Sequence, residues 1–158
     1  MKAIQSTIAA AAIALGVAVP ASAATTDPEV IIYRFPGVSN DGVTNNNGVT
    51  TVFHCTNFSG AAENVRFVTR SSDGGLRTNI VFTLLHLATL TASTHPTNAY
   101  GSSEQTLGIL GPLTGTTAIA ATSTNIICTA MTIDASTAAP IGVALRGIRF
   151  SPVPGSQE

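Results

Sequence analysis

Short runs of β-branched residues recur along this chain and are separated by clusters of Gly, Pro, Asn and Asp. Val, Ile and Thr suit the pleated surface of a strand because their side chains branch at Cβ. The chain shows no 3.6-residue period or heptad typical of long helices, and no internal repeat. This pattern predicts an all-β fold, a single-domain antiparallel β-sandwich of roughly seven to nine strands.

The individual strands can be placed from the alternation and from the turn residues between them. We expect Pro36-Gly37 to end the first strand and a polar loop to occupy 39–48. Ser71-Ser72-Asp73-Gly74-Gly75 predicts a tight hairpin turn, because glycine accepts the positive φ that such turns require. In the strand before that turn, Val65, Phe67 and Thr69 should face the core. In the strands after it, Leu76 should share one side with Ile80, Phe82 and Leu84, and Ser93 should face solvent. The expected strands are 29–35, 49–58, 64–70, 76–85, 88–93, 105–110, 117–123, 125–134 and 141–150.

The chain has two cysteines, Cys55 and Cys128, each within an expected strand. In an oxidising compartment such a pair is most simply one disulfide, and two buried free thiols are the alternative. The bond could join the two sheets of the sandwich or two neighbouring strands. The architecture is immunoglobulin-like in broad terms, but the buried Trp of an immunoglobulin domain is missing, so the strand topology stays open.

The first 23 residues have the composition of a Sec-type signal peptide. Met1-Lys2 supplies a positive start, 8–19 is an apolar run too short to span a bilayer, and Pro20 precedes Ala21-Ser22-Ala23. We expect cleavage after Ala23, a β-sandwich domain over 24–151 and a flexible tail over 152–158. Neither cysteine stands directly after the cleavage site, so we expect no lipoprotein anchor. The protein is therefore expected to be secreted or periplasmic.

Charge restricts the class of partner. The only lysine, Lys2, lies in the leader, so six arginines and eight acids would remain, with a net charge of about −2. A phosphate-binding surface needs a basic surplus, which argues against nucleic acid, and an anionic membrane surface is equally poorly supported. We expect no membrane span. The expected partner is a protein or a glycan of the cell envelope, and oligomerisation is left open.

Several segments resemble a set of small secreted bacterial proteins to which no activity is attached. The matching segments are Ile32-Tyr33-Arg34 with Gly37-Val38, Phe53-His54-Cys55-Thr56-Asn57-Phe58-Ser59, Cys128-Thr129-Ala130-Met131 and the closing Arg149-Phe150-Ser151-Pro152-Val153-Pro154-Gly155-Ser156-Gln157-Glu158. The resemblance spans most of the chain after the leader. It implies secretion and a β-rich domain, and it implies no substrate or catalytic residue.

Two groups of residues have the composition of a metal site. His54, His86 and His95 are the only imidazoles, but they fall at no ligand spacing, which favours structural or surface roles over a shared metal. Asp41 with 45–47 supplies the oxygen ligands that Ca²⁺ prefers, yet it lacks the spacing of an EF-hand, and Asn and Gly also simply form turns. We therefore expect no metal and no cofactor.

A candidate ligand face is formed by Arg66, Arg70 and Arg77, which should project to the same side of the predicted hairpin. Their guanidinium groups could grip a carboxylate or sulfate in bidentate fashion. The alternative is a solvent face, where arginine maintains solubility and covers apolar surface with its stem. The rest of the surface is rich in Thr and Ser and could meet a glycan, with Tyr33 and Tyr100 as the available polar aromatics.

Catalytic chemistry finds little support. The chain has no G-x-S-x-G nucleophile elbow, and its acidic residues are too scattered to name a carboxylate pair. We expect no catalytic residue and predict a secreted or periplasmic, non-catalytic binding or structural module. One alternative is a self-assembling envelope subunit that uses edge-strand pairing, and another is a small metal-dependent enzyme or metal-binding protein built on the histidines.

Overall fold

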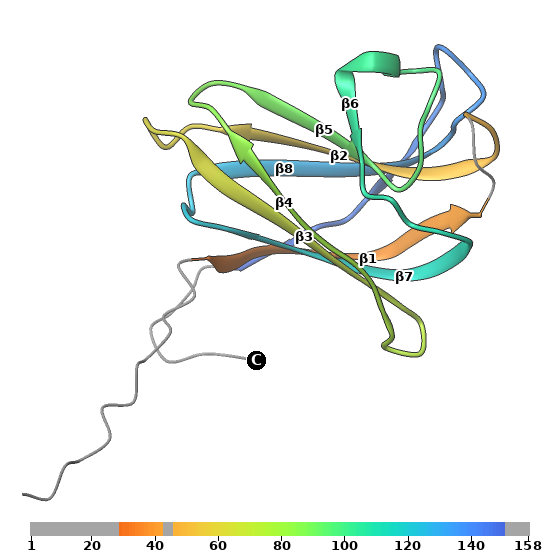
Figure 1. Cartoon of the computed structure of the whole chain (residues 1–158), viewed down its shortest axis with the longest axis horizontal. Coiled ribbons are helices and arrows are strands. Elements are labelled where there is room, and N and C mark those ends of the chain that lie inside the picture. The colour runs from red at the N-terminus through yellow and green to blue at the C-terminus, as the bar shows by residue number, and fades with distance from the viewer. Residues whose placement is uncertain (1–28, 43–45, 151–158) are drawn as a thin grey trace, which may run out of the picture.

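The fold is a sandwich of two five-stranded sheets in a computed structural model that describes residues 29–42 and 46–150 (Figure 1). Every strand pair is antiparallel except β5–β6. Sheet A contains, in spatial order, β10 (Ile148–Arg149), β1 (Val30–Asp41), β7 (Pro112–Ala121), β3 (Glu63–Ser71) and β4 (Leu76–Leu84). Sheet B contains β6 (Glu104–Thr106), β5 (Thr89–Ser93), β2 (Val49–Asn57), β8 (Ile126–Asp134) and β9 (Val143–Leu145). The predicted all-β sandwich is confirmed.

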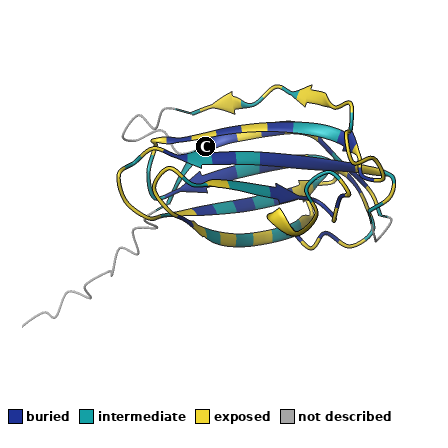
Figure 2. Cartoon of the chain, turned by 90° about the horizontal axis from the view of Figure 1, so that it is seen from above, coloured by how far each residue is buried: buried dark blue, intermediate teal, exposed yellow. Residues whose placement is uncertain are grey.

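The core lies between the two sheets and is centred on three phenylalanines. Phe35, Phe53 and Phe67 are almost completely buried, with ring centroids 5.7 Å apart for the first pair and 5.6 Å apart for the second. Buried and exposed residues alternate along many of the strands, as Figure 2 shows. Val65 and Thr69 are buried beside Phe67, as the alternation predicts. Aromatic pairs of this kind add to the burial of apolar area that stabilises the fold.

β1 does not end at Pro36-Gly37, so that expectation is wrong. The strand continues to Asp41 because a register shift between Pro36 and Val38 absorbs the irregularity, with Gly37 at a φ of 79°. Its extension pairs with the beginning of β7, where Asp41 lies opposite Pro112. β7 consequently begins five residues before the predicted strand at 117–123. Glycine tolerates this backbone conformation, which allows a bulge where a break is expected.

The predicted last strand, 141–150, is in fact two short strands in different sheets. β9 pairs with β8 in sheet B, and β10 pairs with β1 in sheet A. The chain therefore crosses between the sheets around Gly147, where it passes directly over the core. A Cβ at that position would lie 2.4 Å from Cε1 of Phe35, so only glycine lets the backbone approach so closely. With this division, residues 29–42 and 46–150 contain ten strands.

Two further expectations fail at the edges of the sheets. The predicted strand at 105–110 is limited to β6, and its neighbour Ser93, expected to face solvent, is fully buried. In β4, Leu76 does not share the core side of Ile80 and Phe82 and is 54% exposed. The reason is a bulge, because Thr69 pairs with Thr78 whereas Arg70 pairs with Leu76. A bulge of this kind changes the direction of the side chains beyond it.

Cys55 and Cys128 form the predicted disulfide, with their Cα atoms 4.1 Å apart. They are directly opposite residues of β2 and β8, so the bond joins neighbouring strands of sheet B rather than the two sheets. The predicted leader at 1–23 and tail at 152–158 lie outside the described residues. Among the residues that are described, no helix has the length and hydrophobicity needed to cross a bilayer.

Candidate functional site on the outer face of sheet A

The solvent side of sheet A gathers three arginines from two strands. In β1 and β3 the residues that face sheet B are buried, so the alternate residues Arg34, Arg66 and Arg70 point outward. The pairing register places Arg34 opposite Ala118 of β7, and Ala118 opposite Val68 of β3. The three arginines therefore surround Ala118 and Val68 on one face of the sheet.

Elementary strand geometry gives the size of this triangle. Arg66 and Arg70 lie two residues to either side of Val68, so they are about 13 Å apart along β3. Arg34 lies two strands away, about 10 Å across the sheet, and about 12 Å from either of the other arginines. These are Cα separations, and guanidinium groups on long side chains can converge over such a distance.

An aliphatic floor fills the space between the arginines. The floor and the three arginines together form one surface built from four strands, which we call the arginine face. Its residues are Arg34, Pro36, Arg66, Val68, Arg70, Thr116, Ala118, Ala120 and Ile148. A depression of about 210 Å³ lies on it between Arg34, Pro36, Ala118 and Ile148. Within the described strands, the three cross-strand rows that carry the arginines contain no acidic residue. The face is therefore apolar at its centre and basic at its rim.

Each arginine of the face has a different intramolecular anchor. Arg66 forms an ion pair with Glu29, whose side chain is only 4% exposed, and also donates to Oδ1 of Asn79. Arg70 donates to the carbonyl oxygen of Gly74 at 2.9 Å. The guanidinium of Arg34 lies 5.6 Å from the centre of the Phe150 ring, within the range of a cation–π contact. Arg34 and Arg70 are both exposed, so a partner can approach their guanidinium groups.

The structure brings together only part of the arginine cluster predicted from the sequence. Arg66 and Arg70 share the face, but Arg77 donates to the carbonyl oxygen of Leu110 at the edge of β4. Arg77 leaves the face because it is the extra residue of the bulge in β4. Sequence reasoning missed Arg34, although its position between buried Tyr33 and Phe35 in an expected strand was a usable signal.

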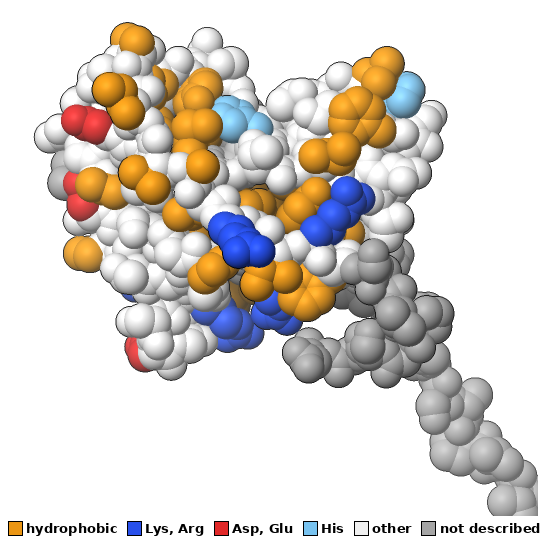
Figure 3. Space-filling view, turned by 180° about the vertical axis from the view of Figure 1, so that it is seen from behind, with side chains coloured by type: hydrophobic (Ala, Val, Ile, Leu, Met, Phe, Trp, Pro, Cys, Tyr) orange, Lys and Arg blue, Asp and Glu red, His pale blue; other side chains and the backbone are white. Residues whose placement is uncertain are grey.

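Cationic residues are distributed unequally between the two sheets. Five arginines belong to strands of sheet A, and Arg146 lies between β9 and β10, whereas the described strands of sheet B contain no lysine or arginine. Figure 3 shows the visible arginines over the middle and lower part of the rear of the molecule, interspersed with hydrophobic side chains. The visible acidic side chains lie along its left margin. The molecule therefore presents one basic side.

The three histidines lie apart and have separate partners. His54 contacts the hydroxyls of Thr91 at 3.1 Å and Tyr100 at 3.2 Å, and partial burial lowers its pKa from the ordinary value. His86 accepts a hydrogen bond from the Gly60 N–H through Nδ1. His95 is buried and contacts Asn40 and the carbonyl oxygen of Asn47. Among the described residues, no group of three or more His, Cys, Asp or Glu side chains could hold a metal ion.

The Asp41 region has the local hydrogen bonds of a turn. Oδ2 of Asp41 accepts the N–H of Val49 at 2.7 Å, which closes the connection between β1 and β2. Asn46 donates to Oδ1 of Asn98 at 2.8 Å. Asn45, the first of the three asparagines considered as calcium ligands, lies outside the described residues. The oxygens of Asp41 and Asn98 are thus used in holding the loops together.

The outer face of sheet B is hydroxyl-rich but offers few aromatic rings. Tyr100 is partly exposed and packs edge-on against His54, with ring centroids 5.0 Å apart. Tyr33, the other aromatic considered for a glycan, is only 7% exposed and lies under the guanidinium of Arg149. A sugar ring usually stacks on an open aromatic face, so Tyr33 is not available for that role.

No protein-family model matches this chain, and neither the curated proteins nor the solved structures contain a significant match to it. The candidate site therefore rests on its own geometry and charge.

Proposed function

We propose that the protein is a non-catalytic binding module that docks a protein partner on the arginine face. The observation that carries this proposal is the combination of an aliphatic floor with exposed Arg34 and Arg70, in cross-strand rows that hold no carboxylate within the described strands. Arginine is enriched in protein interfaces because its stem packs on apolar groups while its guanidinium binds carboxylates. The complementary surface is an apolar patch with an acidic rim.

A protein fits this surface better than a glycan does. The floor is built from Pro36, Val68, Ala118 and Ile148, whose aliphatic groups gain from contact with other aliphatic groups. A glycan would bring hydroxyls that need hydrogen-bond partners, and the floor offers only Thr116 beside the arginines. Exposed apolar patches rimmed by polar residues mark protein or membrane interaction sites or ligand-binding grooves, and the enrichment of arginine at protein interfaces favours a protein here.

We also infer that the protein acts outside the cytoplasm. The leader composition of residues 1–23 and the disulfide between Cys55 and Cys128 support this inference, because such bonds persist in oxidising compartments. N-terminal sequencing of the protein recovered from its own cells should begin at Ala24. A mature chain that retains Met1 would contradict it.

The docking proposal is tested by capture from the envelope and culture fluid of the source, with matched variants as bait. Arg34→Glu/Arg70→Glu reverses two charges of the arginine face, and Thr129→Glu adds one negative charge on the outer face of sheet B as the control. We expect one acidic protein to be retained by the unmodified protein and by the control, and to be lost by the double variant.

The captured protein is then purified and its Kd is measured by calorimetry at two salt concentrations. Binding that weakens at the higher salt and falls at least about tenfold in the double variant supports the proposal, because rim charges of this kind are screened. Retention of the same protein by the double variant, or capture of polysaccharide alone, contradicts it.

A further inference from the structure

β4 is an edge strand of sheet A, and in the described part of the chain β3 is the one strand that pairs with it. An edge strand presents unpaired N–H and C=O groups, and natural proteins usually cover or disrupt such an edge. The first part of β4 is protected in this way. It carries the bulge, the Thr78 hydroxyl donates to the carbonyl oxygen of Leu107 at 2.9 Å, and Arg77 donates to that of Leu110.

The second part of β4, residues 79–84, lacks the bulge and the contacts to 107–110, and only at its end does the carbonyl oxygen of Leu84 accept a hydrogen bond from Nδ2 of Asn57 at 2.8 Å. Its sequence Asn-Ile-Val-Phe-Thr-Leu contains no charged residue, proline or glycine. Ile80 and Phe82 face the core side and are only partly buried, whereas Val81 is 40% exposed on the outer side. An uncharged, β-branched segment at a free edge is a template for pairing with another strand.

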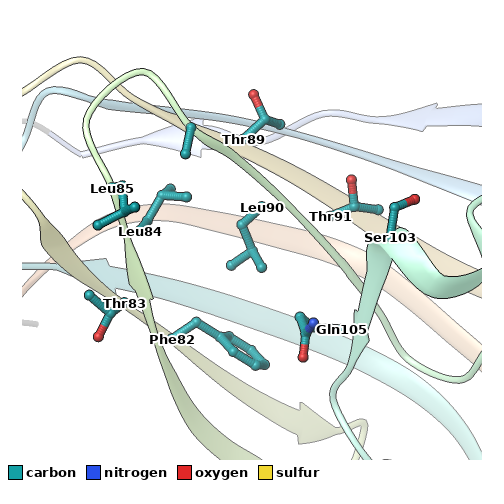
Figure 4. A pocket seen from close by; sticks show the side chains of 10 residues that line it. Phe82, Thr83, Leu84, Leu85, Thr89, Leu90, Thr91, Ser103 and Gln105 are labelled. Atoms are coloured by element: carbon teal, nitrogen blue, oxygen red, sulfur yellow. The ribbon is translucent and has the colours of Figure 1, made fainter.

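A groove of about 310 Å³ lies beside this unprotected segment. Figure 4 shows Phe82 and Leu84 of β4 on one side of the groove, Leu90 of β5 extending into it, and Gln105 of β6 on the far side. No charged side chain lines it among the described residues. The two sheets thus leave an uncharged, partly apolar gap at this edge of the sandwich, which an additional strand would cover.

The sequence of the segment is complementary to itself. A two-fold axis normal to the sheet keeps the core-facing sides of the two β4 strands on the same side of the joined sheet. Even-numbered residues of one strand must therefore lie opposite even-numbered residues of the other. With the axis at Val81, Ile80 of each copy lies opposite Phe82 of the other, and Asn79 lies opposite Thr83. Apolar residues meet apolar residues, polar residues meet polar residues, and no like charges face each other.

We propose that the free edge of β4 binds the same edge of a second copy of this chain in antiparallel register about Val81. The resulting interface is isologous and joins the two A sheets into one continuous sheet. Ile80 and Phe82 of the second copy extend the apolar wall along the groove. The proposal goes beyond the binding function above because it uses a different surface, and it places two arginine faces on the same side of the dimer.

Cysteine cross-linking of the purified protein tests this register directly, since Cys55 and Cys128 already form a disulfide. In Val81→Cys the two new thiols face each other at the axis, with Cβ atoms about 4.5–5.5 Å apart, close to disulfide range. In the control Thr83→Cys the two thiols lie four residues apart along the strands, about 13 Å. We expect mild oxidation to give a covalent dimer for Val81→Cys and little for Thr83→Cys on non-reducing gels.

Sedimentation over a range of concentrations supplies an independent measurement. The unmodified protein should show a monomer–dimer equilibrium, and Val81→Lys should raise the dimer dissociation constant about tenfold or more by opposing two ammonium groups at the axis. A lysine at this exposed position leaves the core unchanged. A monomer at all concentrations, equal cross-linking of both cysteine variants, or no effect of Val81→Lys would overturn the proposal, whether or not the arginine face binds its partner.

Discussion

Replacing Gly147 by alanine tests the crossing that separates β9 from β10. The added methyl carbon would lie 2.4 Å from Cε1 and 2.7 Å from Cζ of Phe35, well inside van der Waals contact. Phe35 cannot move away easily, because it is 1% exposed and its ring centroid lies 5.7 Å from those of both Tyr33 and Phe53. The substitution therefore overpacks the centre of the core.

The expected loss follows from two opposing contributions. Overpacking a well-packed core costs about 1–3 kcal/mol. Gly→Ala also restricts the unfolded chain, which stabilises the folded state by about 0.4–1 kcal/mol where the backbone conformation suits alanine. We expect Gly147→Ala to lower the free energy of unfolding by about 1–2 kcal/mol, measured as a lower urea midpoint with an unchanged m value.

Gly75→Ala serves as the control for this measurement. Its Cβ would meet Oδ1 of exposed Asp73 at 3.1 Å and Oγ of half-buried Ser71 at 3.2 Å, so these atoms need to shift by only a few tenths of an ångström. We expect a change within about 0.5 kcal/mol. Combining Gly147→Ala with Phe35→Leu should show a coupling of about 1 kcal/mol, because the smaller side chain makes room for the methyl. Equal losses for both glycine variants, or strict additivity with Phe35→Leu, would refute the reasoning.

Three further outcomes concern stability. Removing the disulfide with Cys55→Ala/Cys128→Ala should lower the free energy of unfolding in urea by about 4 kcal/mol for a separation of 73 residues, and a loss below about 1 kcal/mol would contradict the chain-entropy argument. Burial lowers the pKa of folded His54, so the unfolded chain binds more protons than the folded one below about pH 6.5. The free energy of unfolding should therefore fall between pH 7 and 5 in the unmodified protein, and fall less in His54→Gln. Parallel curves of unfolding free energy against pH for the two proteins would count against this. The buried hydroxyls of Thr69 and Thr117 lie 2.8 Å apart, so Thr69→Val should cost about 1–3 kcal/mol by leaving one unpaired, and adding Thr117→Val should recover most of that loss. A double variant less stable than the single one would exclude that explanation.

The candidate site could be predicted only in part. Alternation along 64–70 correctly places Arg66 and Arg70 on the solvent side, because one side of that strand is buried. The pairing that brings Arg34 to the same face links residues more than 30 positions apart, and no local pattern encodes it. The position of Arg77 outside the arginine face depends on a single bulge in β4. The bulge shifts the pairing of β3 and β4 by one residue next to their connecting turn.

Local alternation and turn chemistry determined the fold class, most strand positions and the side of most strands that meets the core, because branched side chains and glycine act on their own backbone. The same information placed the two cysteines in strands, but it left open which strands they join. Only the tertiary structure decided that β2 and β8 are neighbours, that Gly147 divides the last predicted strand, and that β4 has a free edge. These features depend on contacts between distant segments, whose pairing is selected by the packing of the whole core.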